Sequence, residues 1–307
     1  MPKPVASEKP GRRLRPTALA LIVLAVAALG GCGGAGGPEA GDPEAEISDA
    51  EFSDAGDARP ERVHPDFDLT AAELAELVSA TPAGTKEAVS ERPAYFLTLA
   101  AKLLAVPESR LALVDKDHAL AADAVPADLV DLARYGEPLT LNRSGLRLRA
   151  VIMPDLLAMS EAARQDGILL PISSTYRSYE YQAGLFERHV AELGEEEASR
   201  VSARPGTSQH QLGTTVDFGS ITLAFAETKS GRWLAEHAGE FGFSMSYPDG
   251  YEELTGYSYE PWHFRWIGRE ATEMEAVFFD GLQQHMLEFW HRNRDALEER
   301  YEDGAAR

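Results

Sequence analysis

Two stretches before residue 110 carry hydrophobic residues at helical spacing. Residues 68–74 offer a helix N-cap candidate followed by apolar positions, and residues 94–105 have the pattern of a second amphipathic helix. We therefore expect a helical prefix over residues 67–110. The prefix lacks an aromatic cluster of the kind that binds glycans, which favours structural support over a separate binding module.

Helices and short strands follow one another through residues 153–267. The apolar pattern predicts helices at residues 153–166, 180–193 and 229–241, and strands at residues 168–173, 216–218, 243–246 and 263–267. Because these elements do not alternate as regular β-α-β units, the segment predicts an α+β fold.

The last segment, residues 269–307, is predicted to form a C-terminal amphipathic helix and a tail. Its apolar stripe between residues 270 and 301 consists of Met274, Val277, Phe278, Leu282, Met286, Phe289 and Trp290. A stripe of this kind is typical of a docking face rather than of a cofactor site.

The N-terminus has the pattern of a secretory signal over residues 1–31. Five basic residues precede an apolar run over residues 18–29, which is too short for a transmembrane span of about 20 residues. The following Leu-Gly-Gly-Cys is similar to the lipobox of bacterial lipoproteins, which implies that Cys32 becomes the lipidated first residue. Cys32 is the only cysteine, so it has no disulfide partner within the chain. The alternative is a plain cleaved signal or a short anchor in which Cys32 is incidental.

The segment that begins at the cysteine has the composition of a disordered tether. Residues 32–66 are acidic, rich in Gly and Pro and poor in large apolar residues. We expect an exported protein, anchored by lipid on the periplasmic side of a membrane. Gly33 after the cysteine is compatible with the outer membrane if the host has one.

The charge balance excludes one class of partner. The net charge is −21, and it becomes about −25 without the first 31 residues, which hold five basic residues and one acidic residue. Such a surface repels phosphate backbones, so nucleic acid is not expected as a partner.

Three residues have the side chains of a catalytic metal site. His210 and Asp217 are separated by a short segment that contains Gly213, and His263 comes later, in the segment Glu-Pro-Trp-His. A catalytic zinc takes three protein ligands of imidazole and carboxylate type and keeps a fourth position for water. Glu260 fits the role of general base for that water. Gly213 is expected at a position that needs a positive φ or a close backbone approach.

The spacing of Glu260 and His263 does not suit a regular strand. Residues three apart lie on opposite faces of a strand, and Pro261 between them cannot donate a ladder hydrogen bond. We expect a distorted start to the strand, which turns both side chains inward. Upstream, Arg177 comes after an apolar run as if at the end of a strand, where a cation could stabilise a developing oxyanion.

Three segments together resemble a known family. They are S-S-T-Y-R-S-Y-E-Y-Q, S-Q-H-Q-L-G-T-T-V-D-F and T-G-Y-S-Y-E-P-W-H-F-R-W. In order and spacing they resemble D-alanyl-D-alanine carboxypeptidases of the VanY type, and the resemblance covers residues 111–268. It implies the fold of the lysostaphin and hedgehog group, in which a small antiparallel sheet with flanking helices holds a zinc ion beneath a substrate cleft.

The resemblance also implies roles for single residues. His210, Asp217 and His263 would bind Zn²⁺, Glu260 would be the catalytic base, and Arg177 would hold the oxyanion.

Two further residues are implied as substrate contacts. These are Gln182 and Ser208; the alternatives are that Gln182 lies on the exposed face of a helix and that Ser208 only caps a turn.

The chain departs from the family pattern in two places. Relatives commonly have S-E-H-Q-T-G-x-A-x-D, where this chain has Gln209, Leu212 and Thr215. Relatives tend to have Arg-Tyr-Pro where this chain has Ser246-Tyr247-Pro248, which removes a cation near the expected cleft. Substrate preference is affected by these changes more than catalysis.

The sequence thus predicts a zinc carboxypeptidase that removes the terminal D-alanine of peptidoglycan stem peptides. Action on tetrapeptides as an L,D-carboxypeptidase, or on crosslinks as an endopeptidase, stays open. The alternative from another class is a non-catalytic zinc-bearing lipoprotein that binds peptidoglycan. His237, His285, His291 and the run at residues 195–197 are expected to be solvated rather than metal ligands.

Overall fold

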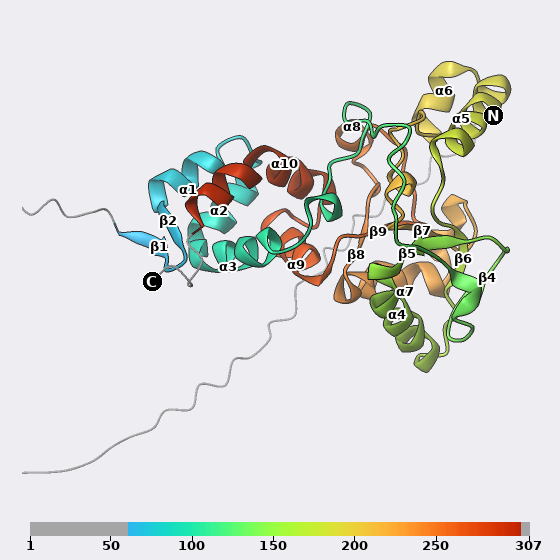
Figure 1. The fold of residues 1–307 in the computed structure, drawn as a ribbon, viewed down its shortest axis with the longest axis horizontal. Helices are drawn as coiled ribbons and strands as arrows, with labels where there is room; N and C mark the ends of the chain where they lie inside the picture. Colours follow the sequence, from blue (N-terminus) through green and yellow to red (C-terminus); the bar gives the residue numbers. More distant parts are fainter. Residues whose placement is uncertain (1–60, 302–307) are drawn as a thin grey trace, which may run out of the picture. The chain divides into compact units, whose positions relative to one another are not determined.

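The computed structural model describes residues 61–301 (Figure 1). The predicted signal peptide, Cys32 and residues 32–60 of the predicted tether lie outside this range. Among the described residues, no helix combines the length and the apolar character needed to cross a bilayer.

The described chain begins with a hairpin and three helices, which are β1 (Arg62–His64), β2 (Phe67–Thr70), α1 (Ala71–Leu77), α2 (Ala83–Glu91) and α3 (Pro93–Leu104). The predicted tether therefore ends too late, because β1 lies within its last residues. Thr70 caps α1: its hydroxyl accepts from the Glu73 amide while the Glu73 carboxylate accepts from the Thr70 amide. The prefix is thus a hairpin followed by helices rather than helices alone.

The C-terminal segment forms two helices instead of the one that was predicted. They are α9 (Arg269–Phe278) and α10 (Gln283–Arg300). Asp280 and Gly281 between them have φ values of 54° and 70°, a conformation that interrupts helical hydrogen bonding.

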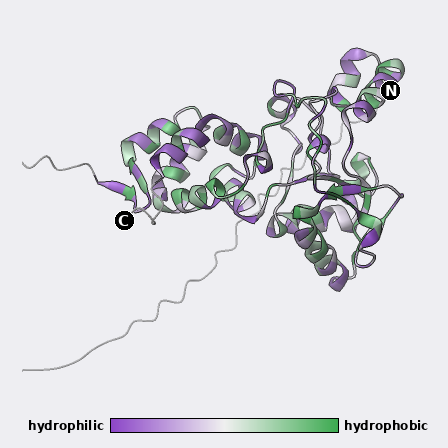
Figure 2. Ribbon diagram, viewed as in Figure 1, coloured by the Kyte–Doolittle hydropathy of each residue, from purple (hydrophilic) through white to green (hydrophobic). Residues whose placement is uncertain are grey.

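One hydrophobic core joins the N-terminal helices to the C-terminal pair. Phe96 of α3 meets Phe278 of α9 and Phe289 of α10 at ring-centroid distances of 5.1 and 5.4 Å. The predicted docking stripe is confirmed for Met274, Phe278, Met286, Phe289 and Trp290, which are all buried in this core. In Figure 2 these helices carry both hydrophobic and hydrophilic residues, as expected of helices that bury one face.

The second part of the fold is built on a five-stranded sheet. The strand order is β4-β6-β7-β9-β8, with β4 (Thr140–Leu141), β6 (Pro171–Ser174), β7 (Thr215–Phe218), β8 (Phe243–Met245) and β9 (His263–Trp266). The predicted antiparallel sheet is present in β6, β7, β9 and β8, and β4 adds a parallel edge strand beside β6. A separate antiparallel pair joins β3 (Leu129–Asp131) to β5 (Arg147–Arg149).

Five α-helices surround these strands: α4 (Met153–Gln165), α5 (Tyr179–Leu193), α6 (Glu195–Val201), α7 (Lys229–His237) and α8 (Glu252–Thr255). Short 3-10 helices lie at η1 (Glu108–Arg110), η2 (Leu132–Arg134), η3 (Ala150–Ile152), η4 (Gln209–Leu212), η5 (Leu223–Glu227) and η6 (Ala238–Phe241). The predicted helix at residues 229–241 is therefore α7 continued by η6.

The two faces of the sheet bury different side chains. Successive residues of a strand point to opposite faces. In Figure 1, α4 and α7 lie against the strands of this sheet. Val216 and Phe264 belong to a second hydrophobic core that includes residues of both helices, so they point to the face that these helices cover. Asp217 and His263 point to the other face, which places the candidate metal ligands there.

Candidate functional site

The three predicted metal ligands converge at the middle of the sheet. Asp217 of β7 is paired with His263 of β9 in the antiparallel register, so their side chains leave the same face side by side. His210 comes from η4, which lies just before β7. The ligand atoms of the three residues all lie within 4.8 Å of one another, and each residue is 3% exposed or less.

Gly213 explains how η4 brings His210 over the sheet. It ends η4 with a φ of 69°. A Cβ at this position would lie 3.0 Å from side-chain carbons of Arg149 and Leu129, so it would be strained by both conformation and contact. The predicted need for a positive φ is confirmed.

Hydrogen bonds fix which ligand atoms face the centre. His210 Nδ1 lies 2.7 Å from the carbonyl oxygen of Thr175, which can only accept, so Nδ1 carries the proton and Nε2 has a lone pair. Nε2 lies 3.2 Å from Asp217 Oδ2. His210 Nε2 and Asp217 Oδ1 are buried without a hydrogen-bond partner among the described residues. Buried polar atoms that converge without partners are what a metal ion would satisfy.

The protonation states also suit a cation. Burial, with a smaller contribution from the nearby charge of Arg177, lowers the pKa of His210 to about 4. Burial alone would raise the pKa of Asp217, but the two adjacent imidazoles of His210 and His263 outweigh it and hold that pKa well below its usual value. At neutral pH His210 is therefore neutral and Asp217 ionised, which are the forms that bind metals.

Glu260 reaches the same centre from a turn. The His263 amide donates to the Glu260 carbonyl at 3.1 Å, which closes a turn through Pro261 just before β9 begins. Glu260 Oε2 then lies 3.2 Å from His263 Nδ1, with the side chain 17% exposed. The predicted distorted start of the strand is confirmed, and the turn brings both side chains to one point.

Arg177 and Gln182 form a supported pair beside the ligands. An Arg177 NH1 group donates to Gln182 Oε1 at 3.0 Å, and NH2 lies 3.4 Å from Asp217 Oδ2. Gln182 Nε2 donates to the carbonyl oxygen of Ala203 at 2.7 Å. Gln182 is 1% exposed, so it is not on an exposed helix face. This geometry favours support of Arg177, and direct contact with substrate stays a prediction for Gln182.

A cleft of about 280 Å³ opens onto these residues. Ser208, which precedes η4 and makes no capping hydrogen bond, is among its lining residues, as its predicted contact role requires. Aromatic residues that the sequence analysis did not select also line it: Tyr181, Tyr247, Tyr257 and Trp262. Tyr247 lies with its ring centroid 4.7 Å from that of His263. The sequence could have indicated Tyr247, because it lies in the segment Ser-Tyr-Pro, where the chain departs from the family pattern near the expected cleft.

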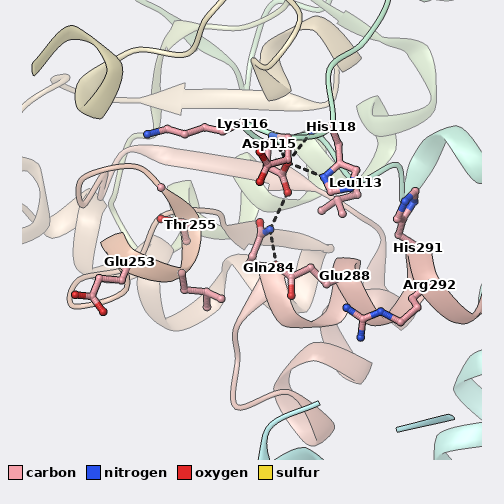
Figure 3. A pocket seen from close by; sticks show the side chains of 13 residues that line it. Leu113, Asp115, Lys116, His118, Glu253, Thr255, Gln284, Glu288, His291 and Arg292 are labelled. Carbon is pink, nitrogen blue, oxygen red and sulfur yellow. Dashed lines mark hydrogen bonds and ion pairs between the residues drawn. The ribbon is translucent and has the colours of Figure 1, made fainter. Parts of the chain in front are cut away.

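A larger cavity, about 640 Å³, lies elsewhere, between residues 113–118, α8 and α10 (Figure 3). It contains none of the converging ligands, so the chemistry assigns the site to the smaller cleft. His237 makes an ion pair with Glu240 on the surface, as expected of a solvated histidine.

Comparison with known proteins agrees with the geometry. The sequence profile of the VanY family, described as D-alanyl-D-alanine carboxypeptidase, matches residues 145–269. YodJ of Bacillus subtilis is 36% identical over 176 residues, or 55% of this chain and 63% of YodJ. A D-alanyl-D-alanine carboxypeptidase of Enterococcus faecalis is 36% identical over 159 residues, or 49% of this chain and 59% of that protein. The chain therefore spans less than two thirds of the length of both relatives.

A solved structure shares the fold. The structure of the LdcB LD-carboxypeptidase is 31% identical in sequence, with a TM-score of 0.52 over 59% of this chain and 86% of that one.

Proposed function

Residues 145–269 belong to the VanY D-alanyl-D-alanine carboxypeptidase family, and from this we propose that the protein is a zinc carboxypeptidase that hydrolyses the terminal D-alanine from peptidoglycan stem peptides. The observation that carries the proposal is the convergence of His210, Asp217 and His263 with Glu260 beside them in an open cleft. A terminal amide bond bound in that cleft would lie next to both the Glu260 carboxylate and the metal ion.

The ligand set supports zinc. Two imidazoles and one carboxylate, with space left on the cleft side, match catalytic zinc sites, which keep one position open. When bound, the metal would supply a Lewis acid and lower the pKa of water to about 7. The unpartnered His210 Nε2 and Asp217 Oδ1 would be two of its ligand atoms.

The chain's own residues perform the proton transfers and hold the charge. Glu260 takes one proton from the attacking water and delivers it to the nitrogen of the departing D-alanine, so the carboxylate is regenerated. Arg177 donates to the carbonyl oxygen as negative charge develops there. Gln182 holds the Arg177 guanidinium through the bond to NH1, and thereby keeps it beside Asp217 at the edge of the cleft.

Two peptides compete as the principal substrate of the proposed enzyme. We assign the terminal D-alanine of the pentapeptide as the principal substrate, because the family is described by that activity. The tetrapeptide is the competing substrate, and LdcB is described as an LD-carboxypeptidase.

The decisive experiment compares Glu260→Gln with the protein's own activity. Release of D-alanine from pentapeptide and tetrapeptide muropeptides is measured with added zinc and with chelator. We expect the substitution to lower kcat by about 10²–10⁴-fold, the range for a general acid–base group. Zinc binding should be retained, because Glu260 is not among the three converging ligands.

The matched control is Glu253→Gln, an exposed residue that lines the other cavity. It should leave kcat unchanged. If the protein binds zinc yet releases nothing from either peptide or from crosslinked wall, a peptidoglycan-binding lipoprotein replaces the enzyme.

We also propose that the enzyme is exported and anchored by lipid at Cys32. Support comes from the signal pattern of residues 1–31, the similarity of Leu-Gly-Gly-Cys to a lipobox and the acidic residues beyond it. Lipid chains would hold it stably at a membrane only in combination, since a single chain binds marginally. Detergent phase partitioning after expression in a bacterium tests this: the full chain should enter the detergent phase and Cys32→Ala the aqueous phase. Aqueous partitioning of both would exclude the anchor.

A further inference from the structure

A buried polar network lies behind His263, on the side away from the cleft. It consists of Gln209 in η4, Ser246 just after β8, and Gln283, the first residue of α10. All three are 2–3% exposed. Gln283 lies outside residues 145–269, so the network joins the C-terminal helices to the family domain.

The orientation of the Gln283 side-chain amide determines which atoms of the network donate and which accept. Its Nε2 lies 3.3 Å from the backbone carbonyl oxygen of Ser244, which can only accept. The amide end that faces Ser244 must therefore be the NH₂ group, and Oε1 must point the other way. Gln283 Oε1 then accepts from Gln209 Nε2 at 3.3 Å and is 3.2 Å from the Ser246 hydroxyl.

Gln209 transmits this direction to the metal ligand. Because its Nε2 is committed to Gln283, its Oε1 faces His263 Nε2 at 3.3 Å and accepts from Ser246 Oγ at 2.7 Å. An oxygen can only accept here, so His263 carries its proton on Nε2. His263 Nδ1 faces the centre of the site, 3.2 Å from Asp217 Oδ1 and 3.2 Å from Glu260 Oε2, so it is the nitrogen from which a metal ion would displace a proton while the Nε2 proton stays directed to Gln209.

We propose that Gln283 is a positioning residue that, through Gln209, fixes the Nε2–H tautomer of His263 and so presents Nδ1 for metal binding. The inference rests on the metal site of the proposed function. A backbone carbonyl in β8 thereby determines which histidine nitrogen binds. Hydrogen bonds from the non-ligating nitrogen of a metal-binding histidine set its tautomer and ring orientation in general, and their loss typically weakens metal binding by about 10–100-fold.

The amide of residue 209 is also required for this network. A glutamate at this position, as in the family pattern, would have no hydrogen to donate to Gln283 Oε1. The pairing of Gln209 with Gln283 is therefore specific to a chain that has an amide at both positions.

Gln283→Leu tests the proposal, and Gln284→Leu is its matched control. Gln284 is the next residue of α10 and is 8% exposed, but its amide donates to Asp115 and Glu288 on the side of the larger cavity (Figure 3). Both variants lose buried amide hydrogen bonds of α10, but only Gln283→Leu removes hydrogen bonds of the network.

Two measurements are made on the full mature chain. Competition with a chromophoric chelator gives the Zn²⁺ dissociation constant, which should rise about 10–100-fold for Gln283→Leu and stay within about 2-fold for Gln284→Leu. Two-bond ¹H–¹⁵N NMR of the zinc-bound protein reports which nitrogen of His263 keeps its proton, with the His263 signals identified by their absence in His263→Gln. The native protein should show Nε2–H, and Gln283→Leu a mixture of tautomers.

Gln283→Glu is the conservative variant. It keeps an oxygen that accepts from Gln209, so we expect it to retain the Nε2–H tautomer even where the leucine variant impairs folding. The proposal is overturned if Gln283→Leu keeps native affinity and tautomer, or if Gln284→Leu weakens zinc binding as much. Neither readout requires peptide hydrolysis, so a protein that cuts no peptide can still pass or fail this test.

Discussion

The two faces of the central sheet differ in what they bury, although the same strands build both. On the face covered by α4 and α7, Val216 and Phe264 are paired across β7 and β9 within a hydrophobic core. One residue further along, Asp217 and His263 are paired on the opposite face. Because successive residues of a strand point to opposite faces, the core residues lie on one face and the candidate metal ligands on the other. A shift of register by one residue would turn each set to the opposite face.

Away from the cleft, the side chains of the polar face are as deeply buried as those of the apolar face. Arg265 beside His263 is fully buried, burial lowers its pKa to about 10, and it donates to the carbonyl oxygens of Arg110 and Ala112. Glu275 of α9 lies over the same face and accepts from Ser244. Buried polar groups are costly unless they are hydrogen-bonded. These hydrogen bonds satisfy only part of the face, because Arg265 Nε and NH1 and Glu275 Oε2 are buried without a hydrogen-bond partner among the described residues.

The largest expected effect comes from breaking the apolar face alone. Phe264→Ala should lower the free energy of unfolding by about 3–5 kcal/mol, because it leaves a cavity beside Val216 in the second core. Denaturant unfolding measures this. Metal affinity per folded molecule should remain close to native, since the neighbouring His263 points the other way. A variant with unchanged stability but lost zinc binding would show that the faces are not separate.

The residues of the candidate site could be predicted from sequence because they fall into two short local patterns. His210, Gly213 and Asp217 lie within one loop and strand, and Glu260 precedes His263 by a single turn. The side-chain types indicate metal chemistry within each segment, and the resemblance of three segments to the family, in order and spacing, groups the two.

The network around Gln283 could not be predicted in this way. Gln209 and Gln283 are 74 residues apart, and an amide has no spacing rule that marks it as a partner. The break between α9 and α10 was missed for a different reason. The apolar stripe continues across the break, and its spacing was given more weight than the Asp280-Gly281 pair, which is a turn signal. The strands β3, β4 and β5 span two or three residues each, too few to show alternation.

The polar face also differs from the apolar face because its stability depends on pH through Glu275. Burial raises the pKa of Glu275 to about 8, although the hydrogen bond from the Ser244 hydroxyl opposes this. The unfolded chain would lose this proton near the ordinary glutamate value of 4.5, while the folded protein keeps it. The contribution of Glu275 to stability is therefore fully present below about pH 4.5 and is lost as the pH rises through about 8.

Glu275→Gln removes this dependence, because an amide does not titrate and still offers Ser244 an acceptor. Compared with the native protein, the variant should be about equally stable near pH 4.5 and progressively more stable up to pH 8, by at most about 1.4 kcal/mol per pH unit. Chemical denaturation at pH 5, 7 and 9 measures the difference, with Glu299→Gln on an exposed position of α10 as the surface control. A constant difference for Glu275→Gln would mean that water reaches this carboxylate, and that the polar face is not sealed by α9.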